Sequence, residues 1–216
     1  MAYTKVRFNK SLILVIVFLF NTGQSMKNSE YATLGGGCFW CIEAAFKQLV
    51  GIKSAISGYM GGNAALATYE NVCSGESGHA EVVQLTFDTT EISAREILEV
   101  FFTLHDATQL NRQGNDVGTQ YRSGIFYHSK EQQELALEVI TEINASDMFH
   151  GVVVTEVTEN SAFFSGENFH QDYFNNNADT PYCQIIISPK LAKFRQTFVD
   201  KLKPTENEVQ PLSAFG

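Results

Sequence analysis

The sequence predicts one α/β or α+β domain, in which helices pack over a small mixed sheet and long loops connect the elements. Segments with the two-residue period of a strand alternate with segments of helical spacing along the 216-residue chain. The strands are few, and several polar loops are too long to be simple connections, which is typical of functional loops. An apolar content of 44% is ordinary for a globular protein that buries a core.

The first 25 residues differ in kind from the rest of the chain. Three basic residues precede an unbroken apolar run at positions 12–20, and small residues follow at Gly23 and Ser25. This pattern predicts a secretory signal over residues 1–25, cleaved near Ser25, and export to the periplasm or cell envelope. The alternative is an uncleaved anchor, although nine apolar residues fall short of the roughly 20 that span a bilayer. Residues 26–203 would then form the domain, and residues 204–216 a tail.

The net charge and the cysteine content narrow the range of functions that the chain could have. The net charge of −9 gives no indication of a nucleic-acid partner or an anionic membrane surface. All four cysteines lie beyond the leader, but a domain of this size does not need disulfides to fold. An exported chain with a Cys-x-x-Cys motif therefore indicates redox chemistry, with an exported reductant to sustain it.

The organising motif is residues 35–41, Gly-Gly-Gly-Cys-Phe-Trp-Cys. It follows an extended segment at 30–34 and precedes apolar residues at helical spacing, so Cys38 and Cys41 are predicted on the first turn of a helix. Backbone N–H groups and the helix dipole favour an anion there, which predicts a lowered pKa for Cys38. The two cysteines would lie on one side of this helix and could form a disulfide with each other. The alternative is that both are small buried apolar residues.

Residues 79–87 form the clearest strand. Their two-residue period places Glu81 on the same face as Val83, Leu85 and Phe87. A carboxylate on an apolar face is desolvated, so we expect its pKa to be raised. The alternatives are that the strand end frays into water or that Glu81 pairs with an arginine.

The other elements follow from local signals. Ser93 and Glu96 form a capping box that begins a helix, Ser129 caps the next helix, and Pro189 begins the last one. Further strands are predicted at residues 52–59, 121–127, 152–157 and 184–187. Polar or irregular loops are predicted at residues 64–78, 105–120 and 163–177.

Three segments in this order carry a family signature: residues 37–41 (Gly-Cys-Phe-Trp-Cys), 78–82 (Gly-His-Ala-Glu-Val) and 110–123 (Leu-Asn-Arg-Gln-Gly-Asn-Asp-Val-Gly-Thr-Gln-Tyr-Arg-Ser). Together they resemble the peptide methionine sulfoxide reductase A family, and residues 169–173 (Phe-His-Gln-Asp-Tyr) are similar to a fourth family segment. The resemblance runs from about residue 31 to residue 203. Family members reduce the S epimer of methionine sulfoxide, free or in proteins, to methionine.

The resemblance implies a two-layer α/β sandwich with a ferredoxin-like core, no metal or organic cofactor, and electrons from a thioredoxin-like reductant. We expect oxidised proteins or free methionine sulfoxide as substrates and a monomeric enzyme. By this resemblance, Cys38 is the nucleophile and Glu81 is the proton donor. The hydroxyls of Tyr69 and Tyr121 hold the sulfoxide oxygen, and Asp116 is a supporting acid. Phe39 and Trp40 form the pocket for the methyl group of the substrate. Ser77 and Ala107 depart from the usual Thr and Pro, and neither position has a catalytic role.

These residues suit the chemistry of a sulfoxide, which is a poor electrophile until its oxygen is protonated. Oxygen transfer would leave Cys38 as a sulfenic acid, which a second thiol converts to a disulfide. Cys41 is the first choice for that thiol because only local unwinding is needed. Cys183 is second, Cys73 third, and plain packing is the alternative for both. The histidines at 79, 105 and 170 are interpreted as structural hydrogen-bonding residues.

Two other functions fit part of the pattern. A thioredoxin-like disulfide oxidoreductase also has Cys-x-x-Cys at a strand-to-helix turn, and Thr180-Pro181 imitates its proline loop; insulin reduction would reveal it. That fold leaves the loop at 111–121 and Glu81 without a role. A zinc module could use Cys38, Cys41, Cys73 and His79. It lacks a second close pair of ligands, and stoichiometric zinc in the purified protein would support it.

Overall fold

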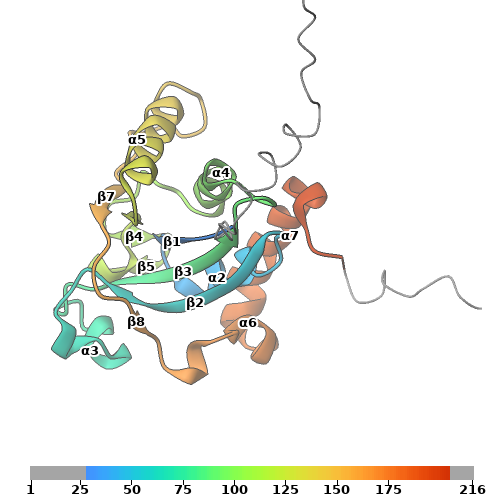
Figure 1. The fold of residues 1–216 in the computed structure, drawn as a ribbon. Coiled ribbons are helices and arrows are strands. Elements are labelled where there is room, and N and C mark those ends of the chain that lie inside the picture. Colours follow the sequence, from blue (N-terminus) through green and yellow to red (C-terminus); the bar gives the residue numbers. More distant parts are fainter. Residues whose placement is uncertain (1–27, 205–216) are drawn as a thin grey trace, which may run out of the picture.

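The computed structural model describes residues 28–204, so the predicted signal at 1–25 and all but the first residue of the predicted tail at 204–216 lie outside the described residues. Within residues 28–204, no helix is both long enough and apolar enough to cross a membrane. Figure 1 shows helices packed against a twisted sheet, as the sequence predicts for an α/β fold.

The sheet has six strands in the order β7-β6-β1-β3-β2-β8. Its strands are β1 (Ser29–Gly35), β2 (Ile52–Met60), β3 (Ala80–Asp88), β6 (Gly124–Tyr127), β7 (Glu156–Glu159) and β8 (Phe164–Ser165). Only β6 and β7 pair in parallel, and the other neighbours are antiparallel, so the sheet is mixed as predicted. A separate two-stranded hairpin consists of β4 (Arg112–Gln113) and β5 (Asp116–Val117).

The predicted ferredoxin-like core is present. The helices are α2 (Phe39–Phe46), α3 (Tyr69–Cys73), α4 (Ala94–Leu104), α5 (Lys130–Asn144), α6 (Tyr173–Asn176) and α7 (Ser188–Thr197). The elements β1, α2, β2, β3, α4 and β6 follow one another as βαββαβ, and β6-β1-β3-β2 form the centre of the sheet. This order brings β1, which leads into the cysteine motif, directly beside β3, which carries Glu81.

The main core lies between the sheet and its helices. The residues of β3 that face it, Val83, Leu85 and Phe87, are fully buried, and Phe46 of α2 and Phe101 of α4 pack in the same cluster. The other face of the sheet carries a smaller cluster, which consists of Met60, Ala80, Val82 and Phe126 with Phe163 against it. The two-residue period of β3 therefore separates two environments, as the sequence predicts.

Local signals set the helix ends. Ser93 and Glu96 make the reciprocal hydrogen bonds of a capping box at the start of α4, and the Ser129 side chain accepts from the backbone N–H of Gln132 at the start of α5. Pro189 occupies the first turn of α7, where a missing N–H costs nothing.

Three predicted strands differ from the structure. The strand predicted at 121–127 begins at Gly124, because Thr119–Tyr121 form a turn of 3-10 helix. Residues 184–187 are not a strand but part of a π-helical segment, Cys183–Ile187, that continues into α7. A short apolar run does not distinguish a strand from a buried helical turn. The strand predicted at 152–157 begins later, at Glu156, because Glu156 is the first residue in register with β6. Val154 instead donates its N–H to the carbonyl of Ala107.

Candidate active site

The glycines before Cys38 make a tight turn between β1 and α2. Gly37 has a φ of +88°, which L side chains rarely adopt, and a Cβ there would lie 2.7 Å from the Gln113 side chain. Its N–H donates to the carbonyl of Tyr121 at 3.2 Å. The turn places Cys38 at the N-cap of α2, as predicted.

Glu81 is buried beside this helix start. Its side chain is 2% exposed, and its Oε2 accepts the backbone N–H of Phe39 at 3.0 Å. Burial raises the pKa of Glu81 to about 8, although the hydrogen bond from Phe39 favours the charged form. The expectation of a raised pKa is therefore confirmed. At neutral pH the carboxyl is mainly protonated and can donate a proton.

The prediction of a lowered pKa for Cys38 is wrong in this structure. Burial raises the pKa of the Cys38 thiol well above its ordinary value, and a hydrogen bond with Cys41 and the nearby carboxyl of Glu81 act in the same direction. The helix N–H nearest the site, that of Phe39, is directed at Glu81. The helix start therefore does not offset the loss of solvent around the sulfur.

Cys41 lies one helical turn further, and it is also buried. The hydrogen bond with Cys38 lowers the pKa of the Cys41 thiol, burial opposes this change, and the positive charge of Lys190 assists it. Of the two hydrogen-bonded thiols, Cys41 is thus the more easily ionised. This asymmetry suits a thiol that attacks an oxidised Cys38.

The predicted site residues meet at one cavity of about 200 Å³. It is lined by Cys38, Phe39, Trp40, Tyr69, Glu81, Asp116, Tyr121 and Tyr182. Burial raises the pKa of both Tyr69 and Tyr121, so their hydroxyls stay protonated and remain hydrogen-bond donors. Seven predicted residues far apart in the chain therefore line one cavity, and Cys41 packs behind it without being part of the lining.

Aromatic rings hold Trp40 at the cavity wall. Tyr173 stacks on the indole, with ring centroids 3.6 Å apart and planes 6° apart, and Tyr182 meets it edge-on. Phe39 lies beside Trp40 with ring centroids 6.2 Å apart. The rings form an apolar wall that could receive a methyl group next to the Cys38 sulfur.

The sequence reasoning missed Tyr182. Its hydroxyl donates to Oδ2 of Asp116 at 2.9 Å, and it is also within reach of the Cys38 side chain, where donation of the same proton would lower the pKa of Cys38. Asp116 and a Cys38 thiolate therefore compete for the one proton of the Tyr182 hydroxyl. The only sequence signal was an aromatic residue directly before a cysteine, within a segment that was predicted as a strand entry.

The structure argues against the zinc module, because His79, its fourth ligand, is already hydrogen-bonded within the loop. His79 uses both ring nitrogens in the loop: Nδ1 accepts the N–H of Gly62 at 3.1 Å, and Nε2 lies 2.9 Å from the carbonyl of Asn63. Cys73 is exposed on α3, whereas Cys38 and Cys41 are buried. Among residues 28–204, no group of three or more His, Cys, Asp or Glu side chains is arranged to hold a metal ion.

Comparisons with known proteins point the same way. Residues 30–202 match the family model described as peptide methionine sulfoxide reductase. The chain is 52% identical over 174 residues to peptide methionine sulfoxide reductase MsrA of Saccharolobus solfataricus, with 81% of this chain and 97% of the relative covered. It is 50% identical over 169 residues to the protein of the same name from Trichodesmium erythraeum, with 78% and 96% covered.

Two solved structures are similar to this chain in fold. The reduced form of Mxr1 from Saccharomyces cerevisiae superimposes with a TM-score of 0.66 at 30% identity and covers 72% of this chain and 89% of its own. Methionine sulfoxide reductase A of Corynebacterium diphtheriae superimposes with a TM-score of 0.63 at 28% identity, and the coverage is 74% and 81%.

The turn before Cys38 gives a first prediction. Gly37→Ala should lower the free energy of unfolding by more than about 3 kcal/mol, because it adds a clash with Gln113 to a strained φ. Gly114→Ala is the matched control: its φ is +61° and nothing lies within 4 Å of the added Cβ. It should cost only about 1–2 kcal/mol for the backbone conformation. Urea denaturation measures both, and equal losses would show that the turn is not tightly packed.

Proposed function

Because the chain belongs to the peptide methionine sulfoxide reductase family, we propose that Cys38 takes the oxygen of methionine sulfoxide with Glu81 as its acid. The enzyme reduces methionine sulfoxide to methionine and so repairs oxidised proteins. The observation that carries the assignment of roles is a protonated, buried carboxyl in the same small cavity as a thiol. A sulfoxide needs both a proton for its oxygen and a nucleophile for its sulfur.

In the proposed complex the sulfoxide oxygen lies against Glu81, Tyr69 and Tyr121. The two hydroxyls would stabilise charge on that oxygen, as donors in an oxyanion hole do. The S-methyl group rests on the wall of Phe39 and Trp40. This arrangement aims the substrate sulfur at Cys38, and we infer that it selects the S epimer.

The reaction balances with these groups alone. The sulfur of Cys38 first bonds to the substrate sulfur. The oxygen then passes to the Cys38 sulfur as the substrate sulfur–oxygen bond and the transient sulfur–sulfur bond break, so methionine leaves and Cys38 becomes a sulfenic acid. Glu81 gives its proton to the oxygen, and the thiol proton of Cys38 returns to Glu81. Tyr182 supports the negative charge that develops on the Cys38 sulfur by turning its hydroxyl proton from Asp116 to that sulfur.

Cys41 is the proposed partner for the second half of the cycle. Its sulfur attacks the sulfenic acid sulfur, a disulfide forms, and the hydroxyl leaves as water with the proton of the Cys41 thiol. A thioredoxin-like dithiol then reduces the disulfide by exchange. Cys183 is buried directly after Tyr182, and Cys73 is exposed on α3, so neither shares a helical turn with Cys38.

We also propose the cellular setting. The leader pattern at residues 1–25 supports export, and the repair reaction uses neither a metal nor an organic cofactor. The substrates are oxidised proteins or free methionine sulfoxide, and the enzyme acts as a monomer. Its reductant must then be an exported thioredoxin-like protein.

The first test is turnover of the separated S and R epimers with dithiothreitol as reductant. The S epimer alone should be consumed, and Cys38→Ser should abolish the reaction because no other thiol lines the cavity. Cys73→Ser is the control and should keep nearly full activity. No turnover of either epimer by a folded, reduced sample would overturn the proposed function, and strong reduction of insulin disulfides would favour a disulfide oxidoreductase.

The pH dependence tests Glu81. The acid is protonated below its pKa of about 8, so the single-turnover rate should fall about tenfold per pH unit above that value. Glu81→Gln should lose about 10²–10⁴ in rate and also lose this fall, because an amide has no proton to give. Glu76→Gln, an exposed acid, should keep the wild-type profile. A Glu81→Gln variant with an unchanged profile would exclude Glu81 as the acid.

The recycling thiol has its own test. Cys41→Ser should still form one methionine per enzyme and leave a Cys38 sulfenic acid that dimedone traps. Multiple turnover with thioredoxin should fall below about a tenth of the wild-type rate, because exchange needs a disulfide. If Cys183→Ser shows this behaviour and Cys41→Ser does not, Cys183 is the resolving thiol.

A further inference from the structure

The cavity has room for one side chain, so the rest of a protein substrate must lie at its mouth. Its volume of about 200 Å³ is below the roughly 300–1,000 Å³ of pockets that enclose whole small ligands. The side chain of an oxidised methionine can enter, but the residues before and after it in a polypeptide stay outside. The protein surface beside the mouth therefore meets these flanking residues.

Phe169 is an aromatic residue on that surface. Its side chain is 61% exposed, and it is the only exposed phenylalanine among residues 28–204. Its ring meets the ring of Tyr69 edge-on, with centroids 6.2 Å apart. Tyr69 lines the cavity, whereas Phe169 does not. Phe169 therefore presents an apolar face to solvent directly beside the wall of the cavity.

The chain around Phe169 is held firmly on its N-terminal side. Residues 168–170 form a turn of 3-10 helix that directly follows Glu167. Oε1 of Glu167 accepts the backbone N–H of Tyr69 at 2.9 Å, which ties this turn to the start of α3. The buried ring of His170 packs against the ring of Phe169 with centroids 4.1 Å apart. The exposed ring thus rests on a fixed base.

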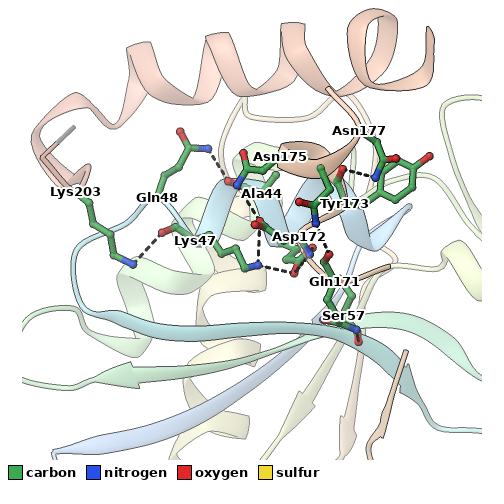
Figure 2. Close-up of polar contacts among 12 residues, drawn as sticks. Ala44, Lys47, Gln48, Ser57, Gln171, Asp172, Tyr173, Asn175, Asn177 and Lys203 are labelled. Carbon is green, nitrogen blue, oxygen red and sulfur yellow. Dashed lines mark hydrogen bonds and ion pairs between the residues drawn. The ribbon is translucent and has the colours of Figure 1, made fainter. Parts of the chain in front are cut away.

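The chain is also held on the C-terminal side of Phe169, as Figure 2 shows. The side-chain amide of Gln171 accepts the N–H of Ser57 at 3.1 Å and donates to the carbonyl of Ser57 at 2.9 Å. The N–H of Asp172 donates to the Glu43 carboxylate at 2.9 and 3.1 Å. A side chain on such a pre-organised segment loses little freedom when a partner covers it.

We propose that Phe169 is a specificity-determining residue that packs against an apolar side chain next to the oxidised methionine in a protein substrate. This inference rests on the proposed function and names the class of polypeptide that the site takes best. Covering an exposed aromatic ring with an apolar group removes both from water, and rigid aromatic rings often dominate binding for this reason. Free methionine sulfoxide has no neighbouring residue, so its turnover should not depend on Phe169.

Steady-state kinetics with four substrates, all as the S epimer, give the first readout. They are N-acetyl-methionine sulfoxide, a capped tripeptide with glycine on both sides of the oxidised methionine, and the two tripeptides in which phenylalanine replaces one glycine. With the wild type, at least one phenylalanine peptide should have a kcat/KM about five- to tenfold above that of the glycine peptide. The gain should come mostly through KM, because the flanking residue adds binding and takes no part in the chemistry.

Three variants separate recognition from a merely structural role. Phe169→Ala should remove the advantage of the phenylalanine peptide and change kcat/KM for N-acetyl-methionine sulfoxide by less than about twofold. Phe169→Tyr keeps the ring and should keep the advantage. Tyr31→Ala is the matched control and should match the wild type with every substrate. Tyr31 is also an exposed aromatic residue that packs against a histidine, but it lies near the end of β1 away from the cysteine motif.

The second readout does not depend on turnover. Trp40 is the only tryptophan in the sequence and lines the cavity, so its fluorescence can follow the binding of each peptide to Cys38→Ser, which lacks the nucleophile. The phenylalanine peptide should bind about five- to tenfold more tightly than the glycine peptide, and adding Phe169→Ala should make the two equal.

The outcomes separate this inference from the proposed function. Equal losses with all four substrates in Phe169→Ala would show that Phe169 only supports Tyr69, and would overturn the inference. A wild type without a preference among the peptides would also overturn it. A wild type that turns over no sulfoxide, although Cys38→Ser binds the phenylalanine peptide more tightly, would overturn the proposed function alone.

Discussion

The buried carboxyl of Glu81 is the interaction on which the site depends. An exposed glutamic acid would be ionised at neutral pH, whereas burial raises the pKa of Glu81 from 4.5 to about 8. This difference corresponds to ~5 kcal/mol in favour of the protonated form. The hydrogen bond from the Phe39 N–H favours the charged form, but burial is the larger effect. The residue is an acid because the fold keeps water away from it.

Keeping this proton has a cost in stability. Between pH 4.5 and about 8 the folded protein binds one more proton at Glu81 than the unfolded chain does. The contribution of this group to the free energy of unfolding therefore falls as the pH rises through that window. Fully buried side chains on the same face of β3, such as Leu85 and Phe87, offset this loss through apolar burial.

The thiol and the acid are coupled. A charged Glu81 raises the pKa of Cys38, so the neutral acid is the state that permits a thiolate. In the empty site burial keeps Cys38 a thiol, and an un-ionised thiol reacts slowly with oxidants. Proton transfer from Glu81 to a bound sulfoxide and from Cys38 to Glu81 would create the reactive state only when substrate is present. The helix start alone does not activate the sulfur.

The periodic parts of the sequence predicted the fold and the centre of the site. The two-residue period of β3 placed Glu81 on the buried face, and the glycines before Cys38 located the turn. The roles of Tyr69, Asp116 and Tyr121 came from family resemblance, because irregular loops carry no period. Tyr182 was missed since it directly precedes a π-helical segment, where the sequence predicted a strand. The pKa of Cys38 was mispredicted because its burial depends on distant segments.

The hydrogen bonds and ion pairs that hold α2 in place also bear on how Cys41 could reach Cys38. Glu43 is fixed to Lys47 and Asp172, so α2 is held firmly from its second turn onward. The first turn depends on a Cys41 N–H to Cys38 carbonyl bond of 3.2 Å and on the Phe39 N–H to Glu81 bond. Unwinding to form a disulfide would break these few bonds and leave the rest of the helix in place. A recycling step confined to one turn therefore fits the packing of this fold.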